Sequence, residues 1–428
     1  MKAAHKLTQA QVDRIAGRSE GGLFLDIEPV DPPPQDRINA TAHEALDQWL
    51  KGTAVTGRTA KPSTPSSTSD AHDTPSTRQF DRIVESQPLP QLPTGLRHRT
   101  TAQPRLTLND LRHEVKDAAD CYRVTVDRYS DLAEQAVSGA NAKLNGAAEL
   151  VGPFVDMIRM DPALPLLLID LEGDREDYLF AHGVNAALLS MTVANSLGYE
   201  RHDVMDVGIG ALFQDIGMLR VPAEIRFAPR TITRDERLVI ERHPISSVDI
   251  LERASALSQT ALLVAYQAHE RNDRSGYPRG RHERSIHPLA RVVNVSDTYA
   301  ALTCTRPHRR AVSPYEAVTT LLHEASDGRL DREVVRSFLD CICLFPIGSY
   351  VELSDGMIAR VLRNNGSAHT QPVVVPLNAD GSETDVEVDL KRLTGLHVVR
   401  AMNHHNPIIG DDPKRPTGPS QPPNASAA

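Results

Sequence analysis

Five residues whose side chains can bind a metal ion are spread singly along the middle of the chain. They are His182, Asp215, His243, His269 and Asp297. Most of them share a helical face with apolar residues, so the periodicity predicts that they point into a helical core. Histidines and aspartates contributed one at a time by several helices are how a helical bundle builds a metal site. The spacing therefore predicts a metal centre inside a bundle.

A polar loop after His269 completes this set of residues. The helix before the loop is apolar, and the loop closes with Gly276, Tyr277 and Pro278. A single histidine on an apolar face is more often a satisfied core residue than a ligand. A buried carboxylate such as Asp215 is costly unless it is paired or bound to a metal. The interpretation as a site therefore depends on the whole set and not on one member.

The composition sets the class of protein. A chain of 428 residues is too long for one small domain, and 40% hydrophobic residues suffice for a core in part of it. The net charge of -9 argues against nonspecific nucleic-acid binding, so no nucleic-acid partner is expected. Four cysteines without C-x-x-C spacing suit a reducing compartment. Without a membrane-spanning apolar run or a signal-type N-terminus, we expect a soluble, cytoplasmic protein with no membrane contact.

Changes in composition and periodicity divide the chain into segments. The first segment is polar and has no assigned role, and a Ser-, Thr- and Pro-rich stretch after it is expected to be a disordered linker. Helical periodicity then gives way to alternating strands separated by Asp-Gly and Asn-Gly turns. The fold class is therefore mainly α, with a small antiparallel β module near the C-terminus. The expected boundaries are 1–50 (unassigned), 51–105 (linker), 106–174 (helical lead-in), 175–345 (helical domain), 346–402 (β module) and 403–428 (disordered tail).

The order of these motifs resembles the HD-GYP family, a branch of the HD phosphohydrolases. Its members are helical, metal-dependent phosphodiesterases that open the bacterial messenger cyclic di-GMP. The resemblance covers about residues 175–345, implies an HD-type helical bundle, and extends to a C-terminal β module seen in some members. The residues that carry it are His182, Asp215-Ile216-Gly217, His243-Pro244, His269-Glu270, Asp273, Gly276-Tyr277-Pro278 and Asp297.

The resemblance implies two divalent metal ions, of the iron or manganese type, that share Asp215 as the catalytic carboxylate. One ion would be held by His182, residue 214 and Asp297, and the other by His243, residue 268 and His269. The forked donors of arginine suit phosphate groups. The substrate-binding residues implied are Gly276, Tyr277, Pro278, Arg306 and Arg310.

The sequence departs from the family pattern at the metal chemistry itself. Gln214 and Ala268 stand where the family has histidines, Met218 where it has a lysine, and Arg274 where it has a glycine. Tyr178 stands where some members have an acidic ligand for a third metal. A glutamine offers only a neutral amide oxygen, a poor substitute for nitrogen at a transition metal. Each site has lost one imidazole, so we expect low metal occupancy.

Three hypotheses about function remain open at this level. The leading one is a degenerate HD-GYP signalling protein that binds cyclic di-GMP, a related nucleotide or a protein partner with little or no hydrolysis. The second is an active phosphodiesterase with water in the vacant ligand positions. The third is a purely structural interaction protein whose surviving site residues are kept by packing. A homodimer is compatible with each of them, and Arg274 is either a replacement for the lost lysine charge or a solvated loop residue.

Overall fold

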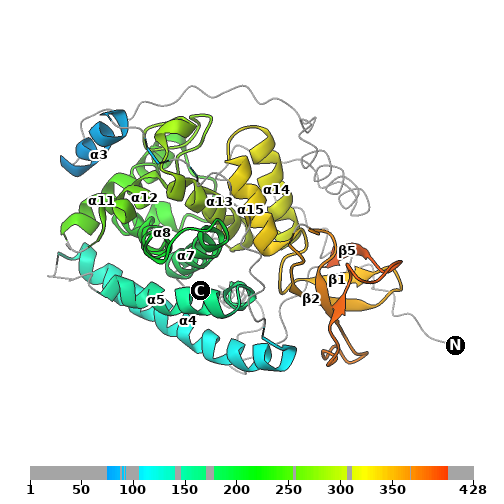
Figure 1. Ribbon diagram of the computed structural model, residues 1–428. Helices are drawn as coiled ribbons and strands as arrows, with labels where there is room; N and C mark the ends of the chain where they lie inside the picture. Colours follow the sequence, from blue (N-terminus) through cyan, green and yellow to red (C-terminus); the bar gives the residue numbers. More distant parts are fainter. Residues whose placement is uncertain are drawn as a thin grey trace, which may run out of the picture.

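The computed structural model describes residues 75–86, 89–90, 92, 106–139, 146–169, 178–253, 257–305, 311–366 and 368–402. Figure 1 shows long helices along one side, a helical bundle in the middle and a small sheet at the end away from helix α3. Residues 1–50, to which the sequence assigned no role, lie outside the described residues. Residues 403–428, which were expected to be a disordered tail, also lie outside them.

The lead-in to the bundle is helical, as the periodicity predicts. It contains α4 (Leu108–Val137), α5 (Ala147–Met160) and the short α6 (Ala163–Leu166). The side chain of Thr107 caps α4 by accepting a hydrogen bond from the amide of Asp110. Tyr122 and Tyr129, on the inner face of α4, are fully buried. Burial of this stripe is what attaches α4 to the bundle.

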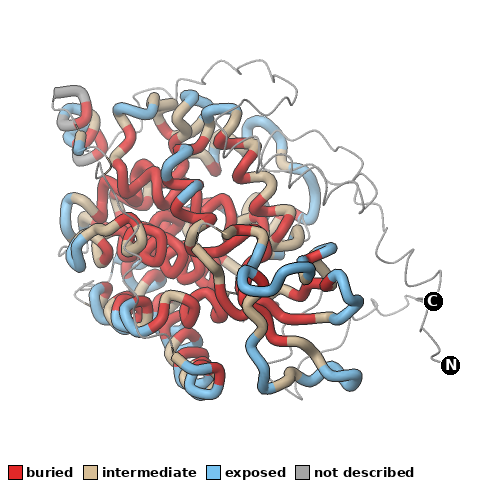
Figure 2. Tube along the Cα trace, turned by 45° about the vertical axis from the view of Figure 1, so that its right-hand side comes forward, coloured by how far each residue is buried: buried red, intermediate tan, exposed pale blue. Residues whose placement is uncertain are grey.

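The bundle is built around α7, whose middle is buried on every side. This central position explains why α7 is apolar around its circumference and not on one stripe only. Figure 2 shows the buried tube of the bundle surrounded by exposed turns. Capping boxes at Thr233 and Ser313 each begin a helix. The elements are α7 (Tyr178–Ser196), α8 (Arg201–Phe213), η3 (Ile216–Arg220), α9 (Ala223–Arg226), α10 (Arg234–Ile240), α11 (His243–Arg253), α12 (Gln259–Gln267), η4 (Glu283–Ser285), α13 (Pro288–Thr303), α14 (Pro314–Ser326) and α15 (Arg332–Ile342).

The C-terminal module is an antiparallel five-stranded sheet with the order β4-β3-β2-β1-β5. The sequence predicts four of the strands and the turns between them, and it misses the last one. In the turns, Gly356 and Gly381 have φ values of +84° and +86°, which glycine adopts without strain. The strands are β1 (Tyr350–Leu353), β2 (Ile358–Arg363), β3 (Val373–Pro376), β4 (Val388–Asp389) and β5 (Val398–Met402).

The sheet shares its hydrophobic core with the helices. Side chains of β1, β2 and β3 belong to the same buried cluster as those of α4 and α7. A buried ion pair joins the guanidinium of Arg363 to the carboxylate of Asp161, which also accepts hydrogen bonds from the amides of Leu106 and Ala163. The module is therefore fastened to the lead-in through both apolar and charged contacts.

Replacing Arg363 by alanine should lower the free energy of unfolding by about 3 kcal/mol, because it leaves the carboxylate of Asp161 buried without its countercharge. The side chains of Arg363 and Asp161 are 5% and 2% exposed. Denaturant unfolding measures the change. Arg400→Ala is the control, since Arg400 pairs with Glu352 at an exposed position and should cost less than about 1 kcal/mol. Equal losses in the two variants would contradict the prediction.

The disordered-linker interpretation is wrong for residues 75–86, which form helix α3 (Pro75–Ser86). Phe80 and Val84, one helical turn apart, are buried at 5% and 8% exposure. The Phe80 ring lies 6.2 Å from the ring of Tyr266. The Ser-, Thr- and Pro-rich composition that suggested disorder precedes this helix, and the average over 51–105 conceals a short amphipathic stretch. The remaining linker residues other than 89–90 and 92 lie outside the described residues.

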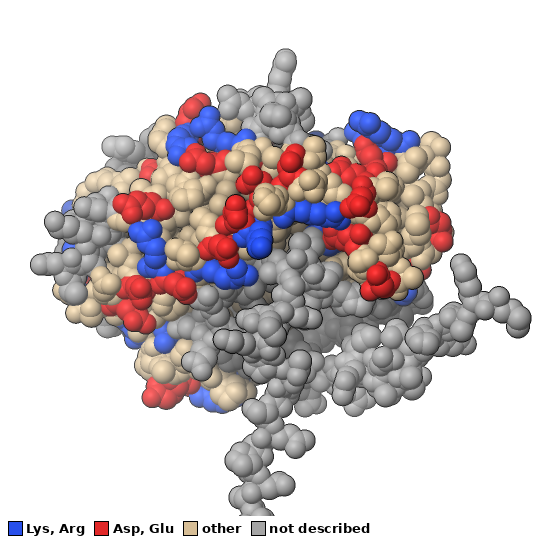
Figure 3. All heavy atoms as spheres, turned by 90° about the horizontal axis from the view of Figure 1, so that it is seen from below, with Lys and Arg blue, Asp and Glu red and all other residues tan. Residues whose placement is uncertain are grey.

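Two surface properties bear on partners. None of the described helices combines the length and the apolar character needed to span a bilayer. In Figure 3, acidic and basic side chains of the described residues are interspersed over the face seen from below. This face therefore lacks the broad basic field that nonspecific nucleic-acid binding requires.

Candidate metal centre

Asp215 is positioned by the close approach of two segments. It follows Gln214, the residue that ends α8, and it precedes η3. A Cβ atom on Gly217 would lie 2.1 Å from the carbonyl oxygen of His243, so only glycine permits this approach. The hydroxyl of Ser247 accepts a hydrogen bond from the amide of Gly217 (2.9 Å) and donates one to the carbonyl of Gln214 (2.7 Å). Ser247, which the sequence did not single out, thus fixes the backbone that carries Asp215 beside α11.

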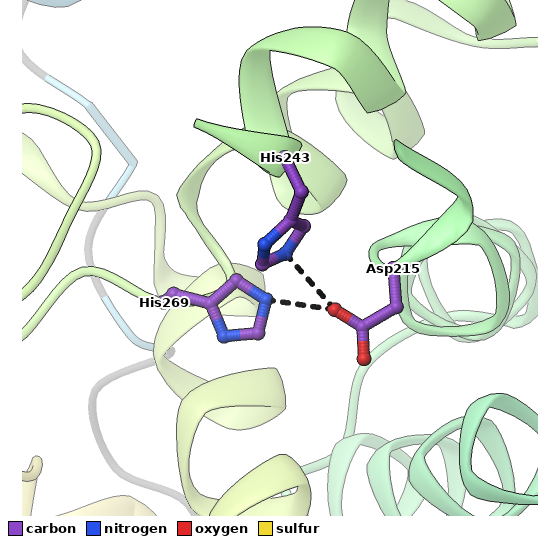
Figure 4. Close-up of side chains that lie close together, drawn as sticks. All are labelled: Asp215, His243 and His269. Atoms are coloured by element: carbon purple, nitrogen blue, oxygen red, sulfur yellow. Dashed lines mark hydrogen bonds and ion pairs between the residues drawn. The ribbon is translucent and has the colours of Figure 1, made fainter. Parts of the chain in front are cut away.

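The first cluster of candidate ligands consists of Asp215, His243 and His269. Oδ1 of Asp215 lies 3.0 Å from Nε2 of His243 and 3.1 Å from Nε2 of His269. Figure 4 shows both imidazoles turned toward this one carboxylate oxygen from separate segments. The two rings contact each other edge to face, with centroids 4.7 Å apart. The donor atoms of the three residues are close enough together to hold one metal ion.

The second cluster consists of His182, Asp215 and Asp297, so Asp215 belongs to both. Nε2 of His182 lies 2.9 Å from Oδ1 of Asp297 and 3.5 Å from Oδ2 of Asp215. Gln214 is fully buried here, and its amide nitrogen donates a 2.8 Å hydrogen bond to the same Oδ1 of Asp297. At this position the amide nitrogen of Gln214 is a donor to the candidate ligand Asp297, and its Oε1 is buried without a hydrogen-bond partner among the described residues.

His243 tests whether these residues fit a metal ion. Its Nδ1 lies 2.8 Å from the carbonyl oxygen of Ile240, which can only accept, so Nδ1 carries the proton. Burial lowers the pKa of His243, which keeps the ring neutral and leaves a lone pair on Nε2. Among the described residues Nε2 has no hydrogen-bond partner, although a carboxylate oxygen faces it. A lone pair and a carboxylate directed at one point are the donor set of a divalent ion.

Asp215, Asp297 and His269 are held in their charged forms. Burial by itself would raise the pKa values of Asp215 and Asp297, but the histidines that face these two carboxylates outweigh it and lower both. Burial likewise opposes protonation of His269, and the two carboxylates outweigh it and raise its pKa to about 9. The metal-free centre is therefore a cationic imidazole between two carboxylates, which a bound cation would replace.

The pKa of His269 predicts a pH dependence for the metal-free protein. An unfolded histidine titrates near pH 6.5, whereas folded His269 titrates near 9. Its stabilising contribution is complete below about pH 6.5 and is lost as the pH rises through 9, by up to about 3 kcal/mol. Denaturant unfolding in chelator at pH 6.5 and 9 measures the loss. His269→Ala should flatten this dependence, and an unchanged slope in that variant would assign it to another group.

The loop after His269 lays Tyr277 against the centre. The rings of Tyr277 and His269 are stacked, with centroids 5.0 Å apart and an angle of 15°. The amide of Tyr277 donates to the carbonyl of His269 (3.1 Å). A Cβ atom on Gly276 would lie 2.3 Å from the amide nitrogen of Arg271, so the turn needs a glycine. Gly276 and Tyr277 thus shape the site, and the buried Pro278 continues the loop.

Arg271, which the sequence reasoning missed, adds a cation beside this loop. One of its guanidinium nitrogens donates to Oγ1 of Thr298 (3.0 Å), next to Asp297 in the chain. It lies near enough to Tyr277 to act on that hydroxyl electrostatically. Its position directly after His269-Glu270 is a signal that could have identified it. Arg306 and Arg310, predicted to contact substrate, lie outside the described residues.

Two of the divergent positions are buried and carry apolar side chains. Ala268 is fully buried at the end of α12 and offers only a methyl group. Met218 lies in a small apolar cluster with Leu179, Val221 and Ile240. The missing lysine has therefore been replaced by a residue that contributes to packing, and the position offers no charge.

Arg274 is exposed and has a φ value of +71°, in the left-handed region that favours glycine. Arg274→Gly should stabilise the protein by about 1 kcal/mol, because the backbone strain disappears while the exposed side chain contributes little. Thermal or denaturant unfolding measures the gain. Arg284→Gly is the matched control, since Arg284 is exposed in the same region without a positive φ, and it should give no gain. A loss of stability on Arg274→Gly would mean that the arginine side chain itself holds the loop.

Comparisons with known proteins identify the class of this bundle. The sequence model of the HD domain family matches residues 167–334. The chain is 27% identical over 307 residues to a cyclic di-GMP phosphodiesterase of Pseudomonas aeruginosa, covering 69% of this chain and 72% of the relative. It is 32% identical over 172 residues to a 3'3'-cGAMP-specific phosphodiesterase of Vibrio cholerae, covering 40% of each protein. A solved HD-GYP-type protein of Bdellovibrio bacteriovorus aligns with a TM-score of 0.46 and 19% identity, over 56% of this chain and 75% of that one.

Residues 167–334 are therefore an HD domain, a helical bundle whose histidines and aspartates can hold divalent metal ions. The relatives that the chain matches are cyclic dinucleotide phosphodiesterases. The resemblance to the HD-GYP family that the sequence suggested is thereby confirmed.

Proposed function

We propose that this protein binds a cyclic dinucleotide at a metal-dependent HD-GYP-type centre and hydrolyses it slowly or not at all. The single observation that carries this proposal is the state of the centre itself. Five ligating side chains converge in two clusters around Asp215, while the two positions that should complete them hold an amide donor and a methyl group.

Metal binding is supported by the donor set that survives. Each cluster supplies three protein ligands, and the proton that Ile240 accepts fixes the tautomer of His243. A bound pair of divalent ions would supply Lewis acidity and an activated water molecule. With Gln214 donating to Asp297, that carboxylate has less negative charge left for an ion. The cluster with His182 is therefore expected to bind metal more weakly than the cluster with His243.

The residues around the ligands have roles of their own. Asp215 is shared, so its two oxygens would lie between both positions. Tyr277 covers one face of His269 and excludes water from it. Arg271 offers a forked cation for a phosphate group near the wall formed by Thr298. Arg306 and Arg310 remain proposed phosphate contacts, because the resemblance to the HD-GYP family implies them.

The ligand class follows from the charges and from the relatives. A cyclic dinucleotide carries two phosphate groups, for which a metal ion and Arg271 are matching partners. Cyclic di-GMP is the first candidate, because the phosphodiesterase of Pseudomonas aeruginosa aligns over most of both chains. 3'3'-cGAMP is the second ligand to test, because it is the substrate named for the relative from Vibrio cholerae.

An active phosphodiesterase is the second candidate function. The observation that favours it is the surviving cluster of Asp215, His243 and His269, whose three candidate ligands include a neutral imidazole with a lone pair for a metal ion. In this alternative, water would occupy the positions that Gln214 and Ala268 leave open. Turnover separates the two candidates.

The experiment combines elemental analysis with binding and hydrolysis. Full-length protein purified without chelator is analysed for metal, then titrated with cyclic di-GMP and 3'3'-cGAMP by calorimetry. Hydrolysis is followed with added manganese or iron. We expect fewer than two metal ions per chain, metal-dependent binding of at least one nucleotide, and negligible turnover. Rapid turnover would establish the second candidate, and absence of both metal and nucleotide binding would leave the structural interaction protein.

A further inference from the structure

Helix α3 packs on the bundle beside the loop that carries Tyr277. Phe80 lies against the ring of Tyr266 on α12, and Val84 is buried on the same face of α3. Figure 1 shows α3 at the edge of the molecule, next to α11 and α12. The helix lies far upstream of residues 167–334, so it is a contact to the HD domain from outside it.

The carboxylate of Asp81 on α3 is contacted by donors from three residues of the bundle. Nε and a terminal nitrogen of Arg279 both lie 3.0 Å from its Oδ2. A terminal nitrogen of Arg281 and the hydroxyl of Tyr266 donate to its Oδ1. The side chains of Asp81, Arg279 and Arg281 are only 18%, 15% and 9% exposed. Such a shielded, charge-assisted network is stronger than a surface ion pair.

The same two arginines are held from the other side through their backbone. The amides of Arg279 and Arg281 donate to the two carboxylate oxygens of Glu270, at 2.8 and 2.7 Å. Glu270 is fully buried and follows His269 directly. The segment that continues from Tyr277 is therefore fixed at its backbone by Glu270 and at its side chains by Asp81.

We propose that Asp81 is a positioning residue for the metal and nucleotide site. By holding Arg279 and Arg281, it keeps residues 276–281 in the conformation in which Tyr277 stacks on His269. The chain upstream of the HD domain thereby controls the site, since release of α3 frees this loop and weakens nucleotide binding. The effect on nucleotide binding rests on the proposed function, whereas the effect on the conformation of residues 276–281 does not.

The test uses the full-length chain with Asp81→Asn, which keeps the shape of the side chain and removes its charge. Amide hydrogen exchange over residues 276–282, measured without nucleotide, should become about tenfold faster. Affinity for cyclic di-GMP should fall by about tenfold, a typical effect of losing a partner that orients a ligand. Gln79→Ala, at an exposed position of the same helix, is the matched control and should change neither quantity.

A double-mutant cycle separates positioning from general destabilisation. If Asp81 acts through Arg281, adding Arg281→Gln to Asp81→Asn should change loop exchange less than the sum of the single effects. Unchanged loop exchange in Asp81→Asn would overturn the proposal, whatever the protein binds. Faster exchange with undiminished cyclic di-GMP affinity would overturn control of the site. If the unaltered protein binds no nucleotide, the proposed function fails, and the exchange data still decide whether Asp81 positions Tyr277.

Discussion

Asp215→Ala is expected to remove metal binding from both clusters at once. The carboxylate of Asp215 faces His243 and His269 with one oxygen and His182 with the other. Each cluster would keep two candidate ligands, and a divalent ion held by two protein side chains is easily lost to buffer and chelator. We expect metal content to fall by more than tenfold and cyclic dinucleotide binding to fall with it. Elemental analysis and calorimetry on the same preparation measure both.

Two controls make this expectation specific. Asp206→Ala removes a carboxylate from α8, the helix that precedes Asp215. Asp206 accepts a hydrogen bond from Ser258 outside the centre, so this variant should leave metal content unchanged. His182→Ala should empty the cluster with Asp297 and spare the cluster with His269. Full metal content in Asp215→Ala would show that the ions are held elsewhere, and the proposed centre would then be wrong.

Restoring the missing ligands is the second change with a large expected effect. Gln214→His and Ala268→His together should raise metal content toward two ions per chain, because each cluster regains an imidazole. The substitution at 214 also removes the amide that now donates to Asp297. Either substitution alone should do little, since groups that act as a unit are strongly non-additive. Adding Met218→Lys should then raise cyclic di-GMP hydrolysis by more than about tenfold over the unaltered protein.

The structure also predicts a cost for this restoration. Met218 packs with Leu179 and Ile240, so a lysine at this position should lower the melting temperature while it raises activity. Gln259→His, at an exposed position of α12, controls for metal captured by any added histidine. If the triple variant folds and still binds no metal, the loss of the two histidines does not explain the low metal occupancy. Other residues of the pocket must then have changed as well.

The sequence predicted those features that depend on local chemistry. The change from helices to strands and the glycine turns between the strands followed from residues adjacent in the chain. Asp215 lies between α8 and η3, but the inward directions of His182 and Asp297 could be predicted because each lies on a buried helix. These are properties that helical periodicity encodes directly.

What the sequence could not predict depends on contacts between distant residues. Asp81 and Arg281 are 200 positions apart, and nothing in the composition around either one indicates the other. The direction of the Gln214 amide follows from packing against Asp297, 83 positions away. Helix α3 was missed because an average over a Ser- and Pro-rich window conceals twelve residues with one buried face.

The common core of the sheet and the helices separates two units that are easily confused. The stretch recognised by the HD domain family ends at residue 334, whereas the buried cluster continues through the sheet to Val398. The boundary of the HD domain match therefore differs from the boundary of the hydrophobic core. A fragment of residues 167–334 would expose the apolar surface that the sheet covers. It would also lack both partners of the buried ion pair between Asp161 and Arg363. An HD domain separated from the sheet would have to bury that surface in another way, so this domain cannot be moved freely to another chain as an isolated fragment.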